Sequence, residues 1–155
     1  MARVVSLFLV CFALGFNMAH AQDYALSFEK LEAVQKTDPK PMVVFLHAPW
    51  CNFCENMKQT TFQNEEVKKL LTRDFHFVSF DGESKEDVSF LGQTFKYKPT
   101  GANTGTHELA QQLGAKEGVV AYPTLVFLND QYEILHQHDA FVNAKQLKKV
   151  LKRLL

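Results

Sequence analysis

The sequence predicts an α/β domain in which helices flank a central mixed sheet. After a first helix, the first half of the chain has the predicted order strand, helix, strand. The last part of the chain has the predicted order strand, strand, helix. The run 42–47 is continuously apolar, as expected for a strand covered on both faces. A mixed sheet with helices packed against it accounts for both observations.

The first two elements are a helix and the buried strand. Residues 22–38 carry apolar side chains at helical spacing, and Ser27 is placed to cap the helix. Residues 38–41 contain two prolines, which end the helix and turn the chain into the strand 42–47. The apolar positions of the helix are Phe28, Leu31 and Val34.

The next elements are two helices and a returning strand. A short loop delivers Cys51 to the start of a helix that continues to about Thr61. Asn64, followed by two glutamates, predicts the N-cap of a second helix. Residues 75–80 then alternate and read as a strand.

The C-terminal part predicts a hairpin and a final helix. Residues 125–128 and 132–135 form two short, largely apolar runs separated by a polar turn, which is typical of antiparallel strands. Asn143 and Gln146 have the spacing of a capping box in front of an amphipathic segment that runs to the C-terminus.

Residues 82–121, here called the excursion, are the least regular part of the chain. We expect a helix at about 87–95, an exposed loop at 98–105 and a second helix at 106–113. Long connections of this kind are often functional, so the excursion either governs partner choice or only covers the sheet.

Residues 1–21 have the composition of an export signal. Arg3 gives a positive start, an apolar run follows, and small residues precede Gln22. The apolar run is short for a membrane span, although an uncleaved anchor is the alternative. Cys11 would leave with the signal, and residues 22–155 would form one domain.

Charge and composition narrow the function classes. Removal of Arg3 with the signal would leave 16 Lys and Arg against 17 Asp and Glu, and no basic stripe indicates nucleic-acid binding. We expect a monomer without cofactor. Zinc is disfavoured because a structural site needs four ligands and residues 22–155 offer a single cysteine pair.

The most informative motif is the pair Cys51 and Cys54 directly after Trp50. Two cysteines three positions apart at a helix start can close a small reversible disulfide. The first sulfur then meets the positive end of the helix, which favours its thiolate. Cys54 lies nearly one turn later and is expected to face the core. Such a pair carries out thiol–disulfide exchange.

This arrangement resembles the thioredoxin superfamily over almost the whole of residues 22–155. The matching parts are the strand before Trp50, the cysteine pair, Pro123-Thr124 and the closing hairpin and helix. Residues 40–44 and 61–67 are most similar to exported thioredoxin-like proteins, a subgroup that includes the C-terminal domain of the membrane reductase supplying electrons to the periplasm.

The resemblance implies a thioredoxin fold and a role for each site residue. Cys51 would be the nucleophile and Cys54 the resolving cysteine of a redox-active disulfide. Pro123 would be the cis-proline that faces the dithiol. The substrate would contact Trp50, Phe53, Tyr122 and Pro123, unless Trp50 only fills the gap between strand and helix.

Two departures from the thioredoxin pattern bear on the chemistry. Phe45 stands where thioredoxins commonly have a buried acidic residue, and Asn52-Phe53 separates the cysteines. His47 or Glu55 would replace that acid as the proton carrier. The alternative is that His47 is only a histidine at the end of a strand and Glu55 only a solvated charge on a helix.

These observations predict an exported, periplasmic thiol–disulfide oxidoreductase that acts on protein dithiols and disulfides. Reduction or electron relay is the leading hypothesis, with a membrane protein as a candidate electron donor. The alternatives are a disulfide-forming oxidase or isomerase, and a binding module with incidental redox activity.

Overall fold

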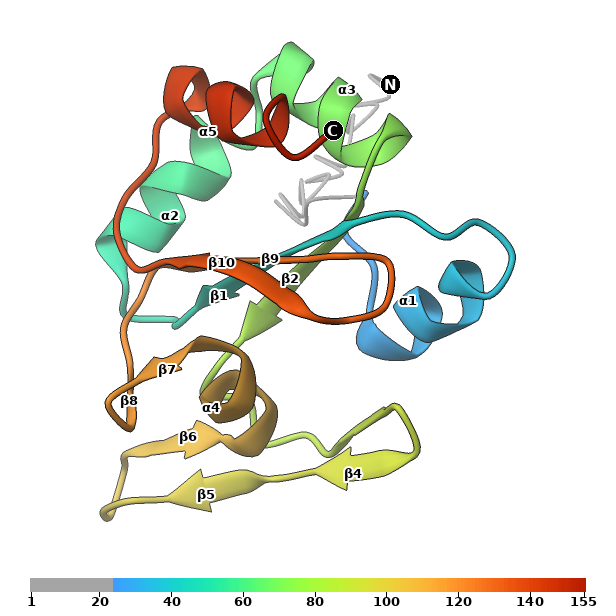
Figure 1. The fold of residues 1–155 in the computed structure, drawn as a ribbon. Helices are drawn as coiled ribbons and strands as arrows, with labels where there is room; N and C mark the ends of the chain where they lie inside the picture. Colours follow the sequence, from blue (N-terminus) through green and yellow to red (C-terminus); the bar gives the residue numbers. More distant parts are fainter. Residues whose placement is uncertain (1–23) are drawn as a thin grey trace, which may run out of the picture.

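The computed structural model describes residues 24–155, so the predicted signal at 1–21 and Cys11 lie outside the described part. A four-stranded mixed sheet in the order β10-β9-β1-β2 forms the centre (Figure 1). β2 is parallel to β1, whereas β9 and β10 run antiparallel to their neighbours. The predicted fold class is confirmed. The strands are β1 (Met42–His47), β2 (His76–Asp81), β9 (Thr124–Leu128) and β10 (Ile134–His138).

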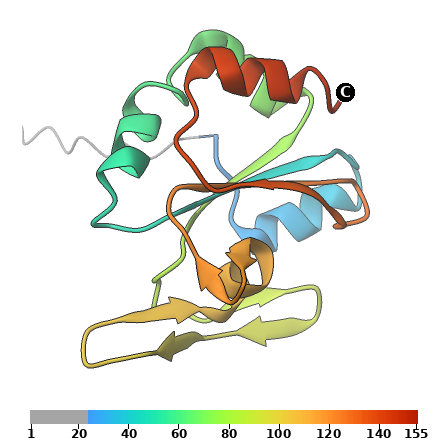
Figure 2. The same cartoon turned by 60° about the vertical axis from the view of Figure 1, so that its left-hand side comes forward.

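Helices cover both faces of this sheet (Figures 1 and 2). Three helices pack on one face and two on the other, and each layer buries its own apolar core. The first layer contains α2 (Asn52–Gln59), α3 (Glu65–Arg73) and α5 (Ala144–Leu151). The second contains α1 (Phe28–Gln35) and α4 (Glu108–Gly114). None of the helices within residues 24–155 has the length and apolar character needed to cross a membrane.

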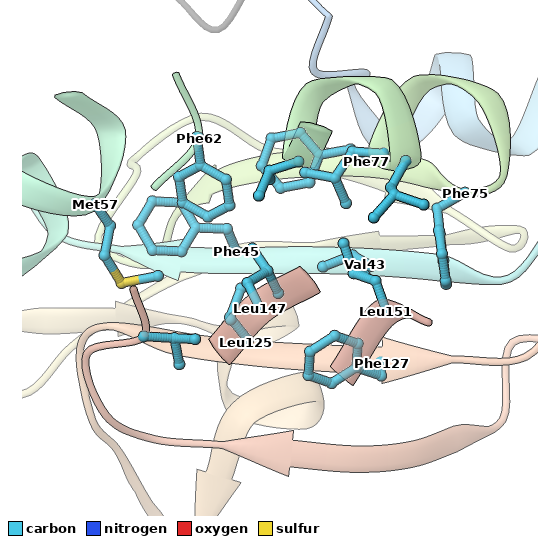
Figure 3. Packing of buried hydrophobic residues seen from close by; sticks show 14 of the residues in the cluster. Val43, Phe45, Met57, Phe62, Phe75, Phe77, Leu125, Phe127, Leu147 and Leu151 are labelled. Carbon is cyan, nitrogen blue, oxygen red and sulfur yellow. The ribbon is translucent and has the colours of Figure 1, made fainter. Parts of the chain in front are cut away.

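The two cores follow from the alternation of side chains along β1. Val43 and Phe45 point to the layer of α2, α3 and α5, where they meet Phe77, Leu125 and neighbouring aromatic rings (Figure 3). Met42, Val44 and Leu46 point to the opposite core. A side chain buried in this way contributes about 1.5–3 kcal/mol to folding, which explains the continuous apolar run.

The predicted helix starts are confirmed by their caps. Ser27 and Asn64 each accept a hydrogen bond from a backbone N–H of the helix they precede. Asn143 and Gln146 form the complete capping box at the start of α5. The helix expected over 51–61 is shorter, since α2 ends at Gln59.

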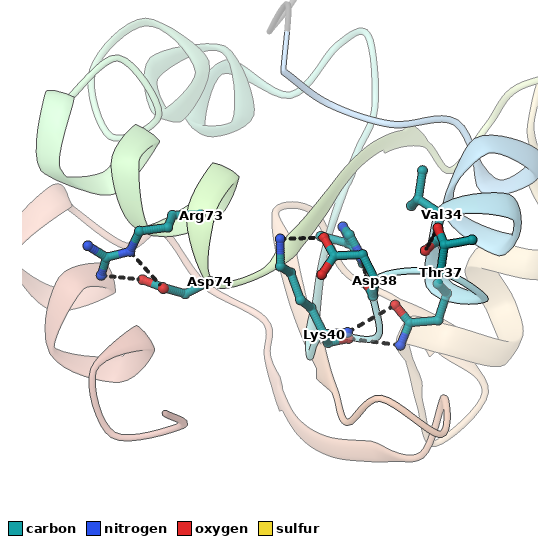
Figure 4. Close-up of polar contacts among 8 residues, drawn as sticks. Val34, Thr37, Asp38, Lys40, Arg73 and Asp74 are labelled. Carbon is teal, nitrogen blue, oxygen red and sulfur yellow. Dashed lines mark hydrogen bonds and ion pairs between the residues drawn. The ribbon is translucent and has the colours of Figure 1, made fainter.

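Polar contacts fix the end of the sheet where β1 and β2 begin. Lys40 and Asp38 form an ion pair of 2.6 Å, and the ring of His76 donates to the carbonyl of Asp38 at 2.7 Å. Arg73 and Asp74 pair at the end of α3 (Figure 4). Because β1 runs away from this end toward Cys51, the opposite end of the sheet is left for the cysteine pair.

The excursion differs from its predicted helices. The helix expected at 87–95 is wrong, because this segment is a hairpin whose turn residues Leu91 and Gly92 both have positive φ (52° and 76°). Such turns favour the twist of paired strands. The loop at 98–105 connects two further strands, and the helix expected from 106 begins at Glu108. The strands are β3 (Val88–Phe90), β4 (Gln93–Phe95), β5 (Tyr97–Pro99), β6 (Gly105–His107), β7 (Ala115–Lys116) and β8 (Val119–Val120).

The closing hairpin also differs slightly from its prediction. The second strand, β10, starts at Ile134 rather than 132, because Tyr132 adopts a positive φ of 66° in the turn. Asn129 closes this turn by accepting hydrogen bonds from the backbone of Gln131 and Glu133.

Candidate active site

The cysteine pair lies where the chain passes from β1 into α2. Cys51 is the N-cap of α2, and its Sγ accepts a hydrogen bond from the backbone N–H of Cys54 at 3.1 Å. The two sulfurs form a disulfide, with the Cα atoms 5.2 Å apart. Both cysteines are buried, and Cys51 retains slightly more exposure as a residue (5%) than Cys54 (1%).

The helix start provides the electrostatic environment of Cys51. The first N–H groups of α2 have no partner within the helix, and the dipole adds positive potential at this end. A thiolate on Cys51 would accept the same hydrogen bond from Cys54 that the disulfide sulfur accepts. The geometry therefore favours the thiolate form of Cys51 over its thiol form.

Trp50 and Tyr122 lie together beside the disulfide. Trp50 is 64% exposed, and its Nε1 donates to Glu83 Oε1 at 3.0 Å. Its ring meets that of Tyr122 edge-on, with the centroids 5.9 Å apart. An indole this exposed forms surface and does not fill the gap between strand and helix. The structure therefore brings two of the expected substrate-contact residues, Trp50 and Tyr122, into contact with each other.

Tyr122 and Pro123 immediately precede β9. The peptide bond between them is cis, as expected, and Pro123 is buried. The Tyr122 ring lies over Gly82, where an added Cβ would come within 2.7 Å of Tyr122 Cε1. Burial, together with the nearby carboxylates of Glu83 and Asp81, raises the pKa of Tyr122 well above its usual value, so the phenol stays neutral.

Phe53 and Phe141 extend the apolar surface on the other side of the cysteines. Phe53 is 66% exposed, which confirms the expected exposure, and its ring centroid lies 6.3 Å from that of Phe141. Phe141 belongs to the loop before α5 and was missed from the sequence. It stands between Ala140 and Val142 in a segment with no helical or strand periodicity, so no local pattern marked it.

Phe45 leaves the space beneath the cysteines without a carboxylate. It is fully buried in the same core as Cys51 and Cys54 and packs on Phe62, with ring centroids 4.7 Å apart. His47 lies two positions further on the same strand face, 5.4 Å from the Phe45 ring.

His47 and Glu55 were the two predicted substitutes for that acid. Lys58 Nζ donates to His47 Nδ1 at 3.2 Å. Burial, and secondarily the positive charge of Lys58, lowers the pKa of His47 to about 4, so its ring is neutral near pH 7. Glu55 instead accepts a hydrogen bond from Gln59 at 2.8 Å on the exposed side of α2. His47 is therefore the candidate that faces the core of the cysteines.

Metal-ligating side chains do not gather at this site. Within residues 24–155, no group of three or more His, Cys, Asp or Glu side chains is arranged to hold an ion.

The fold and the cysteine pair define a protein of the thioredoxin superfamily. The sequence model of a thioredoxin-like domain matches residues 28–155. The chain therefore belongs to this family, and its fold with a Cys-x-x-Cys pair supports thiol–disulfide redox chemistry in general.

Solved structures agree on the fold. The chain is similar to a DsbH oxidoreductase, with 23% identity, a TM-score of 0.57, and coverage of 84% of this chain and 83% of that one. It is similar also to a thioredoxin from Thermus thermophilus, with 19% identity, a TM-score of 0.58, and coverage of 83% of each chain.

A curated relative matches a shorter stretch. Human spermatogenesis-associated protein 20 is 35% identical over 60 residues, which are 39% of this chain. The matched stretch spans 8% of the length of that relative.

Proposed function

We propose that this protein is an exported thiol–disulfide oxidoreductase that reduces, or relays electrons to, disulfides of protein partners. The observation that carries the proposal is the cysteine pair at the start of α2. Cys51 caps the helix and is the less deeply buried of the two residues, whereas Cys54 lies within the first turn of α2 and is 1% exposed. Exchange needs this combination of one accessible thiolate and one protected resolving thiol.

The reaction proceeds in two exchanges. The Cys51 thiolate attacks one sulfur of the partner's disulfide, whose S–S bond breaks, and the departing partner thiolate takes a proton from water. Cys54 then loses its proton, and its thiolate attacks Cys51 Sγ. The second partner thiolate leaves and is protonated. Two electrons have passed to the partner, and the protein is left with the Cys51–Cys54 disulfide seen in the structure.

The partner segment would lie on the apolar surface around the disulfide. Trp50 and Phe53 present exposed rings on either side of Cys51, and Phe141 widens this surface. Tyr122 and Pro123 would border the segment on the sheet side. Exposed aromatic side chains of this kind are enriched at protein contact surfaces, which supports their assignment to substrate binding.

His47 would receive the proton that Cys54 loses. It shares a strand face with Phe45, which lies in the same core as the cysteines, and it is neutral near pH 7. A neutral imidazole can accept a proton, and its lowered pKa means that it passes this proton on readily to water.

Location and direction rest on the sequence. Residues 1–21 have the composition of an export signal, and residues 22–155 would be the exported, periplasmic domain, working as a monomer. The reductive direction rests on the resemblance of residues 40–44 and 61–67 to exported reductive proteins. A membrane protein would supply the electrons.

A trapping experiment tests the proposal. Cys54→Ser removes the resolving thiol, so mixed disulfides between Cys51 and its partners should accumulate as dithiothreitol-sensitive bands on non-reducing gels. The matched Cys51→Ser variant should give none. Absence of bands with Cys54→Ser would favour a binding module with incidental redox activity.

The reduction potential decides the direction. A value near that of thioredoxin, about −270 mV, supports reduction, whereas a value near about −120 mV would identify an oxidase. Equilibration of the purified protein with glutathione redox buffers, followed by mass analysis of the two forms, gives this value.

A further inference from the structure

A groove of about 680 Å³ lies within the excursion, away from the disulfide. Helix α4, the hairpin β7–β8 and the strands β4 to β6 enclose it. Its volume falls within the range of about 300–1,000 Å³ that is typical of ligand pockets.

The walls of the groove are held by specific contacts. Gln111 Nε2 donates to the carbonyl of Gly118 at 2.8 Å, which ties the β7–β8 turn to α4. Glu108 pairs with Lys98 at 3.0 Å and accepts a hydrogen bond from the backbone of Lys96 at 2.7 Å. The two charged side chains that line the groove therefore neutralise each other.

The rest of the lining is neutral and offers both donors and acceptors. Gln93, Thr94, Thr106 and Gln112 contribute amides and hydroxyls, which can bind the N–H and C=O groups of an extended backbone. Val119, which is 68% exposed, adds an apolar contact at the rim. This lining suits an uncharged polypeptide segment better than a charged ligand.

One wall of the groove lies close in the sequence to the candidate active site. Val120 lines the groove and stands three positions before Pro123, a span of about 10 Å in an extended chain. In the view of Figure 1, the hairpin β7–β8 lies below the start of α2 on the left of the molecule. A partner chain that passes Pro123 can therefore run on into the groove.

We propose that this groove binds the extended, uncharged segment of a protein partner that flanks its target cysteine. The inference rests on the proposed function, since it adds a second contact region to the same exchange reaction. The dithiol would carry out the chemistry, and the groove would select partners whose flanking sequence is extended and free of charge.

Two matched probes test the proposal on the reduced full chain carrying Cys11→Ser. The short probe is N-acetylcysteine amide in mixed disulfide with thionitrobenzoate. The long probe carries the same cysteine with an uncharged extension of about eight residues. One version has the extension on the N-terminal side of the cysteine and a second version has it on the C-terminal side. At about 3.3 Å per residue, this extension is long enough to cross to the groove and enter it. Attack on the cysteine sulfur releases coloured thionitrobenzoate, so its release rate gives the rate constant.

The extension on one side should raise the second-order rate constant about tenfold, which corresponds to about 1.4 kcal/mol. Gln112→Trp, an exposed α4 position that lines the groove, should abolish this gain and leave the short probe unchanged. Gln131→Trp, an exposed position in the β9–β10 turn, is the matched control and should keep the gain. If Gln112→Trp also slows the short probe, Thr94→Trp replaces it.

Equal rates for the short and long probes would overturn the groove proposal while leaving the proposed function intact. The groove proposal also fails if Gln112→Trp and Thr94→Trp both keep the gain, or if Gln112→Trp dissociates a dimer, which would make a second copy of the chain the occupant. Failure of the short probe to react through Cys51 would instead overturn the proposed function.

Discussion

Acidification should destabilise the folded protein through His47. Its pKa in the folded protein is about 4, against 6.5 for an unperturbed histidine. Because the unfolded chain binds this proton more readily, the stabilisation is fully present above about pH 6.5 and is lost as the pH falls toward 4. A shift of this size corresponds to about 3 kcal/mol in total.

Urea unfolding of the oxidised protein at two pH values measures this effect. Between about pH 7 and about pH 5, titration of His47 should lower the free energy of unfolding by about 2 kcal/mol. His47→Gln should lack this part of the loss, whereas His136→Gln, at an exposed position on β10, should retain it. Lys58→Met should reduce the loss, because the ammonium group is the second cause of the lowered pKa.

The comparison with His47→Gln is needed because another buried histidine titrates in the same direction. Burial also lowers the pKa of His107, which lies within the excursion core. Its contribution is the same in wild type and variant and therefore cancels. An equal pH dependence in wild type and His47→Gln would refute the reasoning, since His47 would then be as accessible to protons in the folded state as in the unfolded chain.

Three further predictions follow from the site. In the reduced chain carrying Cys11→Ser, brief alkylation at neutral pH should label Cys51 in preference to Cys54, which mass mapping checks, and the reverse preference would exchange their roles. Phe45→Asp should lower the free energy of unfolding, measured in urea, by at least about 3 kcal/mol, because it removes a fully buried ring and buries a carboxylate. The buried carboxylate should also make the exchange rate depend more steeply on pH. An unchanged pH profile would place the carboxylate away from the cysteines. Gly82→Ala should lower the free energy of unfolding by about 1–3 kcal/mol, because the added methyl group crowds the Tyr122 ring. It should also shift the fluorescence emission of Trp50, the single tryptophan, whose ring meets that of Tyr122. Unchanged stability and emission would contradict these contacts.

The elements that could be predicted are those marked by a local motif or by a repeated pattern of apolar residues. The run 42–47 is apolar at every position up to Leu46 because both faces of β1 are buried, and Asn143 with Gln146 carries a cap that depends only on spacing. The cysteine pair was recognisable for the same reason, since its chemistry lies within one helical turn.

The rest depended on contacts between distant residues. A helix was expected at about 87–95, but Phe90 is buried against Phe28 of α1, and the positive φ at Leu91 and Gly92 turns the chain back. Phe141 could be assigned to the surface near the cysteines only through its contact with Phe53, which lies far away in the sequence. The groove arises from several short strands, none of which has a strong pattern of its own.

The way in which the excursion joins the sheet explains how partner choice and chemistry can be separated. Its apolar side chains, such as Phe95 and Leu109, pack in the core opposite to that of Cys51 and Cys54. Tyr122 contacts both cores, and Glu83 at the start of the excursion holds Trp50. The sheet therefore separates most of the excursion from the packing around the disulfide, and Glu83 and Tyr122 are its links to the surface that would receive a partner.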